Sequence, residues 1–450
     1  MRMNRVLVAF VGLIAASVWA ASNGAIGTGE EPTVDHWSVI RCGKLIAVPG
    51  EPPIRNATVV THNGRIMSVD RGGAQGRPAG ATADSVVDQI DLSDKWVMPG
   101  LIDCHVHITS QFSKDIRMRM VTDTDADATI NAVIYARRTI NAGFTTVRDV
   151  GSMGDACFAL RDAINAGKIV GPRILASGRA ITPTGGHADR THGYARGIFE
   201  MPDAFVGVAD GVAECRKAVR YQVKRGADVI KLTSTGGVLS NTAAGTEQQF
   251  FDDELSAIID TAHLLGRKVA SHAHGTTGIK AALRAGVDSI EHGTYLDDEA
   301  ISLFKQTGAY LVPTITAGKA VEQYAHIPGF YPPPVVKKAL EVGPTIQGAF
   351  AKAYKAGVKI AFGTDAGVYP HGENWREFGY MVEAGMPLEE ALIAATVSAA
   401  DLCNMSEEIG TIEVGKAADM IATSGDPRAN VDELREIDVV VKGGIKVKGE

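Results

Sequence analysis

The chain has 450 residues, of which 45% are hydrophobic and 22% charged, and its formal net charge is −7. This composition is that of an ordinary globular protein, so it excludes a collagen-like or largely disordered chain, and the length accommodates a barrel plus a smaller module. Acidic residues outnumber basic ones and no block of like charge occurs, which argues against a nucleic-acid partner.

The first twenty residues have the pattern of a secretory signal peptide. A basic start with Arg2 and Arg5 precedes an apolar run over residues 6–16, and Val18 and Ala20 have the spacing of a cleavage site. The alternative is an uncleaved membrane anchor, but the run is shorter than the roughly 20 residues that a spanning helix needs. We therefore expect cleavage after this segment and export to the periplasm or the extracellular space, with no stable membrane anchor.

Five cysteines are scattered along the chain without a repeated spacing, namely Cys42, Cys104, Cys157, Cys215 and Cys403. This pattern indicates neither a disulfide framework nor a cysteine-rich zinc ribbon, and most of the five are expected to be small core residues. In an oxidising compartment one pair could bridge, and the sequence leaves open which one.

Both ends of the chain show short β-strand patterns separated by tight turns. Residues 34–95 hold several such apolar runs, and the pair Asn63 and Gly64 between two of them is a strong hairpin signal. The same pattern returns over residues 409–450. We therefore expect one small β-sandwich module formed from both chain ends.

Between these ends, residues 96–408 alternate short apolar strands with helical stretches such as 127–143 and 252–268. The strand candidates are eight in number: 96–108, 144–150, 173–181, 227–235, 268–274, 289–295, 309–316 and 359–365. Eight strand–helix units in succession predict an α/β fold, a (β/α)8 TIM barrel that forms the catalytic domain. An open doubly wound sheet is the alternative, but no glycine-rich phosphate turn follows the first strand.

Ionisable residues stand at the ends of these strands, where TIM barrels carry their catalytic groups. Residues two apart on a strand share a face, so His105 and His107 point together while Cys104 faces away as a packing residue. The other candidates are His272, His274, His292 and Asp365. One histidine alone is more often structural than a ligand, but several imidazoles and a carboxylate at strand ends suit zinc or a related divalent ion.

Lys231 lies within the apolar run of the fourth strand, so its ammonium would point into a barrel interior where an isolated charge is costly. One explanation is an ion pair with Asp365 or another acid. The other is that the neutral amine has combined with carbon dioxide to give a carbamate, whose two oxygens bridge two cations. A buried lysine loses its proton readily, which permits this chemistry.

These residues lie in motifs that resemble the amidohydrolase superfamily. The motifs are PGLIDCHVH, VIKL, SHAHG, SIEHG, FGTDAG and the closing GTIEVGKAADMI, and the match runs from about Val34 to the end. Within that superfamily the chain is most similar to the group of bacterial Xaa-Pro and Xaa-Arg/Lys dipeptidases, imidazolonepropionase-like proteins and the amidase that cleaves ochratoxin.

The resemblance implies two divalent ions, expected to be zinc. It assigns His105, His107 and Asp365 to the first ion, His272 and His292 to the second, and a Lys231 carbamate to both. A hydroxide shared by the ions would attack the substrate, and Asp365 would pass its proton to the leaving amine. The resemblance makes His274 a neighbour of the substrate rather than a ligand.

Substrate contacts are expected from the loops after the strands. The loop after the third strand carries His187, Arg190, His192 and Tyr194, and Arg148 ends the second strand. With His274, residues such as His187, Tyr194 and Arg148 could hold a carbonyl oxygen or a substrate carboxylate. Residues 316–343, with three consecutive prolines, are expected to form a lid or an oligomer contact.

The leading functional hypothesis is hydrolysis of a peptide-like amide that frees a C-terminal amino acid, as from a dipeptide, an N-acyl amino acid or an ochratoxin-type amide. The ligand set alone also suits a lactone or cyclic-amide ring-opening hydrolase. A deaminase of the superfamily usually works with one ion and no bridging lysine, so Lys231 argues against it. The non-enzyme alternative is a binding protein on the same fold, which retention of every candidate ligand disfavours.

Overall fold

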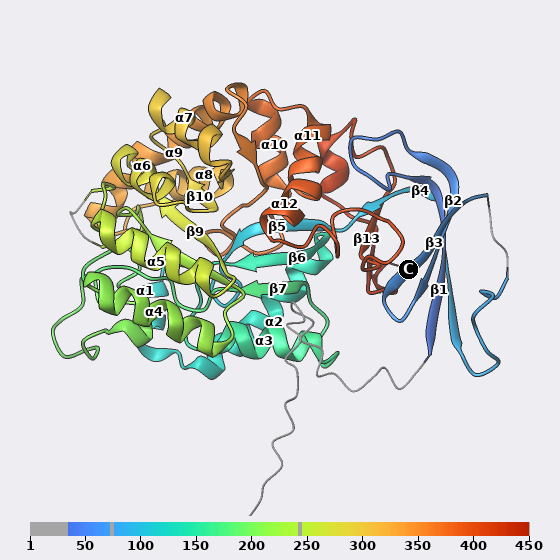
Figure 1. The fold of residues 1–450 in the computed structure, drawn as a ribbon, viewed down its shortest axis with the longest axis horizontal. Coiled ribbons are helices and arrows are strands. Elements are labelled where there is room, and N and C mark those ends of the chain that lie inside the picture. Colours follow the sequence, from blue (N-terminus) through green and yellow to red (C-terminus); the bar gives the residue numbers. More distant parts are fainter. Residues whose placement is uncertain (1–34, 73–75, 242–244, 450) are drawn as a thin grey trace, which may run out of the picture.

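A computed structural model of the protein describes residues 35–72, 76–241 and 245–449, so the expected signal peptide lies outside the described residues. Figure 1 shows a large body of strands and helices beside a smaller sheet to which the N-terminal strands belong. Within the described residues, no helix is both long and apolar enough to cross a membrane.

Both ends of the described chain contribute to one seven-stranded sheet, in the order β15-β14-β13-β4-β1-β2-β3. Its strands are β1 (His36–Leu45), β2 (Ile54–His62), β3 (Arg65–Arg71), β4 (Val86–Pro99), β13 (Met420–Thr423), β14 (Val439–Lys442) and β15 (Ile445–Lys448). The turn between β2 and β3 places Asn63 at φ 46° and Gly64 at φ 81°, the left-handed pair that a two-residue hairpin requires. The predicted hairpin is confirmed.

The sheet curls over an apolar core. Ile66 of β3 donates to Lys416 and accepts from Gly415, so the first and last parts of the described chain meet at the backbone. Ile40, Val59 and Met420 are among the buried residues of this core. The described strands form one continuous sheet rather than two separate ones, so the predicted β-sandwich is not confirmed.

A strand lies within each of the eight segments predicted for the barrel, and all are parallel to their neighbours. They are β5 (Leu101–Val106), β6 (Phe144–Asp149), β7 (Arg173–Ala176), β8 (Val229–Thr233), β9 (Lys268–Ala273), β10 (Ser289–His292), β11 (Tyr310–Val312) and β12 (Lys359–Ile360). They form a three-stranded sheet, β5-β6-β7, and a five-stranded sheet, β12-β11-β10-β9-β8.

Backbone contacts join these two sheets on both sides. Ile181, beyond β7, donates to Lys231 and accepts from Thr233 of β8. On the other side His107 donates to Ala366, and Asp365 donates to His105. The strands therefore have the circular order of a TIM-barrel-like α/β fold, with single bridges rather than full ladders at the two joints.

Helices follow the strands and cover the outside of this ring (Figure 1). They are α1 (Ile116–Thr122), α2 (Asp125–Asn141), α3 (Ala156–Asn165), α4 (Gly211–Arg225), α5 (Asp252–Leu264), α6 (Thr276–Arg284), α7 (Asp298–Thr307), α8 (Ile315–Ala325), α9 (Pro333–Lys355), α10 (Arg376–Glu383), α11 (Leu388–Ala394) and α12 (Val397–Leu402), with 3-10 turns at Ala204–Val206 and Val431–Leu434. The predicted helices at 127–143 and 252–268 correspond to α2 and α5.

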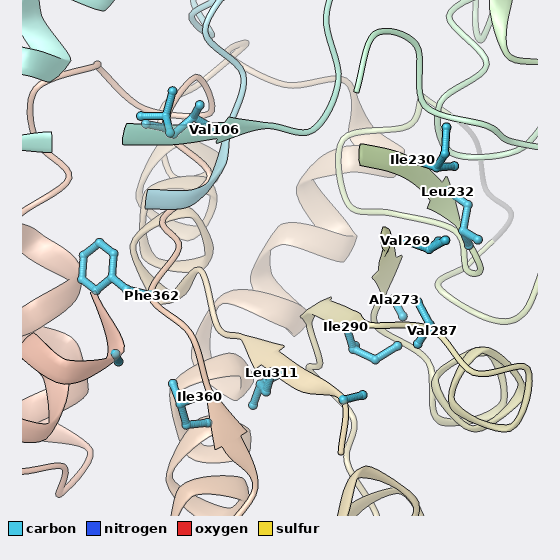
Figure 2. Close-up of a cluster of buried hydrophobic side chains, with 14 of the residues drawn as sticks. Val106, Ile230, Leu232, Val269, Ala273, Val287, Ile290, Leu311, Ile360 and Phe362 are labelled. Atoms are coloured by element: carbon cyan, nitrogen blue, oxygen red, sulfur yellow. The ribbon is translucent and has the colours of Figure 1, made fainter. Parts of the chain in front are cut away.

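Alternation along the strands separates the core from the site. Ile230 and Leu232, on either side of Lys231, belong to the buried apolar cluster drawn in Figure 2 together with Val269 and Ala273 of β9. Because successive side chains point to opposite faces of a strand, Lys231 is directed to the inside of the ring.

The five cysteines are buried and free. The Cys104 Sγ lies 3.9 Å from the Cys403 Sγ, among residues that include Ala399 of α12. Cys104 therefore packs away from the histidines that flank it, as its position in the strand predicts.

Candidate metal centre and substrate cavity

The first group of candidate ligands is His105, His107 and Asp365, which offer nitrogen and oxygen atoms within 4.8 Å of one another. The Asp365 Oδ1 lies 3.2 Å from the His107 Nε2 and 3.6 Å from the His105 Nε2. Asp365 has φ 60°, a left-handed conformation that costs energy in a residue other than glycine. This bend turns the carboxylate toward the two imidazoles.

The second group is His272, His274 and His292, whose ligand atoms also lie within 4.8 Å of one another. The rings of His272 and His292 are 4.5 Å apart between centroids. Strand alternation alone would point the His292 side chain outward, because Ile290, two residues earlier, lies in the outer apolar cluster. A φ of 73° at His292 turns its ring back toward the inside.

Hydrogen bonds fix which nitrogen of each imidazole is free. The His107 Nδ1 donates to the Gly151 carbonyl at 2.7 Å. The Thr314 hydroxyl donates to the Pro313 carbonyl, so it accepts from the His292 Nδ1, which lies 2.7 Å away. Each ring therefore keeps an unprotonated Nε2, the form that binds a metal.

Lys231 lies between the two groups in the order of the strands and is buried. Within the described residues its ammonium makes no hydrogen bond and no ion pair with an acid. Burial lowers the pKa of Lys231 to about 8, despite the attraction of Glu291 and Asp365. The predicted ion pair with Asp365 is therefore not formed, and the amine is close to its neutral, reactive form.

Two buried polar atoms at this place make no hydrogen bond in the described structure, the His272 Nε2 and the Asp365 Oδ1, although the latter lies close to His105 and His107. Such atoms are rare in native proteins, because each costs about 1–3 kcal/mol when it is left without a partner. Burial, together with neighbouring histidines and Lys231, also keeps the pKa of His272 and His292 well below the usual value, so both rings are neutral. Neutral imidazoles and an ionised carboxylate with free lone pairs fit divalent cations.

Glu291 is a functional residue that the sequence reasoning missed. Its buried carboxylate accepts from the His105 Nδ1 at 2.7 Å, from Arg148 at 2.9 Å and from the Ser289 hydroxyl at 2.6 Å. Burial alone would raise the pKa of Glu291, but Arg148 and His105 outweigh burial and lower this pKa to about 2. The carboxylate thus orients His105 and leaves its Nε2 toward Asp365. The signal was available, since Glu291 follows Ile290 and must point inward by alternation.

Arg148 differs from its predicted role as a substrate contact. Its guanidinium donates to the Cys104 carbonyl, the Ser289 hydroxyl and Glu291, and its exposed fraction is 1%. It lies beneath the ligands and does not line the cavity. The reason is that position 148 precedes the end of β6, so its side chain enters the packed interior of the ring.

Asp103 was also not singled out from the sequence. Its buried carboxylate accepts from the backbone amides of His105 and Thr364, from the Thr364 hydroxyl and from the Asn374 side chain. These bonds connect the end of β5 to the segment after β12. They therefore hold His105 and Asp365 side by side.

A cavity of about 770 Å³ opens over both ligand groups, a volume typical of small-molecule sites. Of the remaining predicted contacts, His187, Tyr194 and His274 line it. The His187 ring stacks on His272 with centroids 4.1 Å apart, and its Nδ1 lies 2.6 Å from the Ser240 hydroxyl. The Tyr194 hydroxyl instead donates to the Arg117 carbonyl, so it is already engaged.

The segment predicted as a lid or oligomer contact forms α8, a turn and the start of α9. Its apolar side chains build one wall of the cavity, among them Val321, Tyr331, Val335 and Val342. Lys338 connects this wall to the loop after β8, because its buried ammonium donates to the carbonyls of Gly237 and Ser240 at 2.8 Å each.

Comparisons with known proteins agree with this geometry. Ochratoxinase of Aspergillus niger is 32% identical over 439 residues, which cover 92% of this chain and 87% of that protein. A crystal structure of a Xaa-Pro dipeptidase with methionine bound in its active site is 44% identical, covers 92% of this chain and 100% of its own, and has a TM-score of 0.87. Imidazolonepropionase of Rhizorhabdus wittichii is 26% identical over 82% of this chain and 88% of its own length.

The family model described as the amidohydrolase family matches residues 96–447, which is most of the chain. Together with the relatives, this match confirms the resemblance found from the six motifs. The chain therefore belongs to the amidohydrolase family and is a metal-dependent hydrolase.

Proposed function

We propose that the protein uses two divalent metal ions, most simply zinc, to hydrolyse a peptide-like amide and release a C-terminal amino acid. The single observation that carries this proposal is the pair of buried atoms that make no hydrogen bond, the His272 Nε2 and the Asp365 Oδ1, which belong to two separate ligand groups at the floor of one cavity. Two groups on either side of one buried lysine favour two ions over one.

In this proposal His105, His107 and Asp365 hold the first ion, and His272 and His292 hold the second. Lys231, as a carbamate, would provide ligand oxygens for these ions. The absence of a partner for Lys231 and its lowered pKa support the modification, because only a neutral amine adds carbon dioxide. His274 shares the second group, and we assign it to the substrate because the resemblance to the family implies that role.

Bound at these residues, the ions would supply Lewis acidity and a hydroxide near neutral pH. Asp365 then acts as the proton carrier. Its Oδ1 has no hydrogen-bond partner and lies 3.2 Å from the His107 Nε2, and Asp365 lines the cavity, so the carboxylate can accept a proton from a water molecule and deliver it to the leaving nitrogen. His187 stacks on His272 and lines the cavity, where its ring can contact the substrate.

The names of the relatives support an amide substrate. Ochratoxinase and a Xaa-Pro dipeptidase are named for substrates in which an amide joins an acyl group to an amino acid, and the cavity has room for a molecule of that size. We further propose that residues 1–20 direct export and are cleaved, which mass spectrometry of the mature protein would test.

The test is metal content together with amino-acid release. Elemental analysis of the wild type should give about two ions per chain, and a panel of dipeptides and N-acyl amino acids should yield a free amino acid. Lys231→Ala should lose metal and activity, and added acetate, which fits the vacated space and offers two oxygens, should restore part of both. A structural lysine would not show this rescue.

Two histidine variants distinguish a metal ligand from a residue that contacts only the substrate. His272→Ala should lose one ion, whereas His274→Ala should keep both and lose activity. Turnover of lactones or cyclic amides without release of amino acids would replace the proposal with a ring-opening hydrolase. A wild type with no metal and no turnover would leave a binding protein.

A further inference from the structure

The cavity has two walls of opposite character. The wall built by α8 and α9, which follow β11, is apolar and includes Val335 and Val342. Two arginines line the cavity elsewhere, Arg179 just beyond β7 and Arg190 in the loop that follows. In the circular strand order β7 and β11 are the third and seventh of eight, so these walls lie across the ring from each other.

Arg179 and Arg190 differ from other arginines near the site because their guanidinium groups have no hydrogen-bond or ion-pair partner among the described residues. By contrast, Arg117 at the same cavity donates to the carbonyls of His192 and Gly193. Arg148 is fully engaged below the ligands.

The two unpaired guanidiniums are partly buried, and both line the cavity. Burial, and to a smaller extent the charge of Arg179, lower the pKa of Arg190 to about 9, although the charges of Asp125 and Asp149 act in the opposite direction. The carboxylate of Asp149, whose charge acts on Arg190, is itself committed to the Ile108 amide and the Ser152 hydroxyl. Burying cations without a direct ion pair is unfavourable, and a bound anion would offset part of that cost.

Hydrogen bonds hold the loop of Arg190 in place. The neighbouring Asp189 accepts from the amides of Gly185 and Thr191 and from the Thr191 hydroxyl. Arg179 is fixed in turn, because its backbone amide donates to the Gln222 side chain at 3.1 Å. Binding an anion here therefore requires little ordering of the backbone, which favours a built subsite over two solvated side chains.

We infer that Arg179 and Arg190 form a subsite for a carboxylate of the substrate. Planar guanidiniums bind carboxylates with paired, charge-assisted hydrogen bonds. The inference rests on the proposed function in one respect, that the ligand is the hydrolysed amide. The carboxylate belongs either to the released amino acid or to an acidic acyl group, and matched substrates distinguish these sources.

The experiment uses the metal-loaded enzyme and pairs of substrates that differ in one charge. The first pair is N-acetyl-L-phenylalanine and its C-terminal amide, and the second is the C-terminal amide of N-succinyl-L-phenylalanine and its succinamoyl counterpart. Each pair is assayed for kcat/KM with the wild type, Arg190→Gln, Arg179→Gln and Arg190→Lys. The control is Lys114→Gln, which removes an exposed positive charge at the cavity edge.

Arg190→Gln and Arg179→Gln should each lower kcat/KM about ten- to a hundredfold for the charged member of one pair, mainly through KM, and leave the neutral member within about threefold. The pair that responds identifies which carboxylate binds. Arg190→Lys should recover part of the loss, and Lys114→Gln should change both members alike.

Calorimetric binding of 3-phenylpropionate and of succinate to the same proteins separates this inference from the proposed function. Binding of either carboxylate that weakens about tenfold or more in Arg190→Gln supports the subsite even if no amide is cleaved. Equal effects on charged and neutral substrates, with unchanged carboxylate binding, would overturn it.

Discussion

Replacing Glu291 tests the buried charges beneath the metal ligands. Glu291→Gln keeps the shape of the side chain but removes the charge that faces Arg148 at 2.9 Å and the His105 Nδ1 at 2.7 Å. Both Glu291 and Arg148 are shielded from water, with exposed fractions of 0% and 1%. Removing one partner of such a buried pair costs about 3–5 kcal/mol, because the other charge stays desolvated and uncompensated.

The free energy of unfolding should be measured by urea titration in the presence of a chelator, so that metal loss does not contribute. The matched control is Glu299→Gln. Glu299 pairs with Lys280 at 2.8 Å and with Arg284, but its side chain is 54% exposed. Exposed pairs contribute about 0–1 kcal/mol, so this variant should stay close to wild type.

Glu291→Gln should also weaken metal binding about ten- to a hundredfold, measured by competition with a chromogenic chelator, since His105 loses the carboxylate that orients it. The double variant Arg148→Met with Glu291→Leu should be more stable than Glu291→Gln, because it leaves no buried charge. If Glu291→Gln unfolds within about 1 kcal/mol of the wild type, like Glu299→Gln, then the argument from charge compensation is refuted.

Two further predictions concern groups that are not assigned as metal ligands. Burial lowers the pKa of Lys338 to about 8 from an unfolded value of 10.5, so its charged form opposes folding below about pH 8 and this cost disappears as the pH rises toward 10.5. The stability of the wild type relative to Lys338→Met should therefore rise by up to about 3 kcal/mol across that window; a constant difference in parallel unfolding titrations would contradict it. Cys104→Ala should keep the wild-type metal content and lose about 1 kcal/mol, because its thiol packs against Cys403; loss of an ion in elemental analysis would show that it serves the metal centre.

The sequence was sufficient to predict the elements and their order. Apolar runs of strand length alternating with helical stretches placed a strand in each of eight segments, and the pair Asn63 and Gly64 predicted its hairpin, because both signals are local. The ends of parallel strands meet at one edge of the ring, so residues far apart such as His105 and Asp365 can be grouped from the sequence alone.

What the sequence alone did not decide depends on contacts between distant segments. Alternation would turn His292 outward, and a left-handed φ of 73° reverses it. Arg148 was expected in the cavity, but Glu291 and Ser289 hold it below the ligands. The carboxylate of Glu291 hydrogen-bonds to His105, although the two residues are 186 positions apart in the chain.

The tertiary structure also decided which charges have partners. In the sequence Arg117, Arg148, Arg179 and Arg190 are alike, and any of them could pair with an acid or with a backbone carbonyl. Folding satisfies the first two and leaves the last two without a partner among the described residues, facing the cavity. Hydrogen-bond satisfaction is a property of the whole packed structure, because it depends on which donors and acceptors the fold brings within about 3 Å of each other.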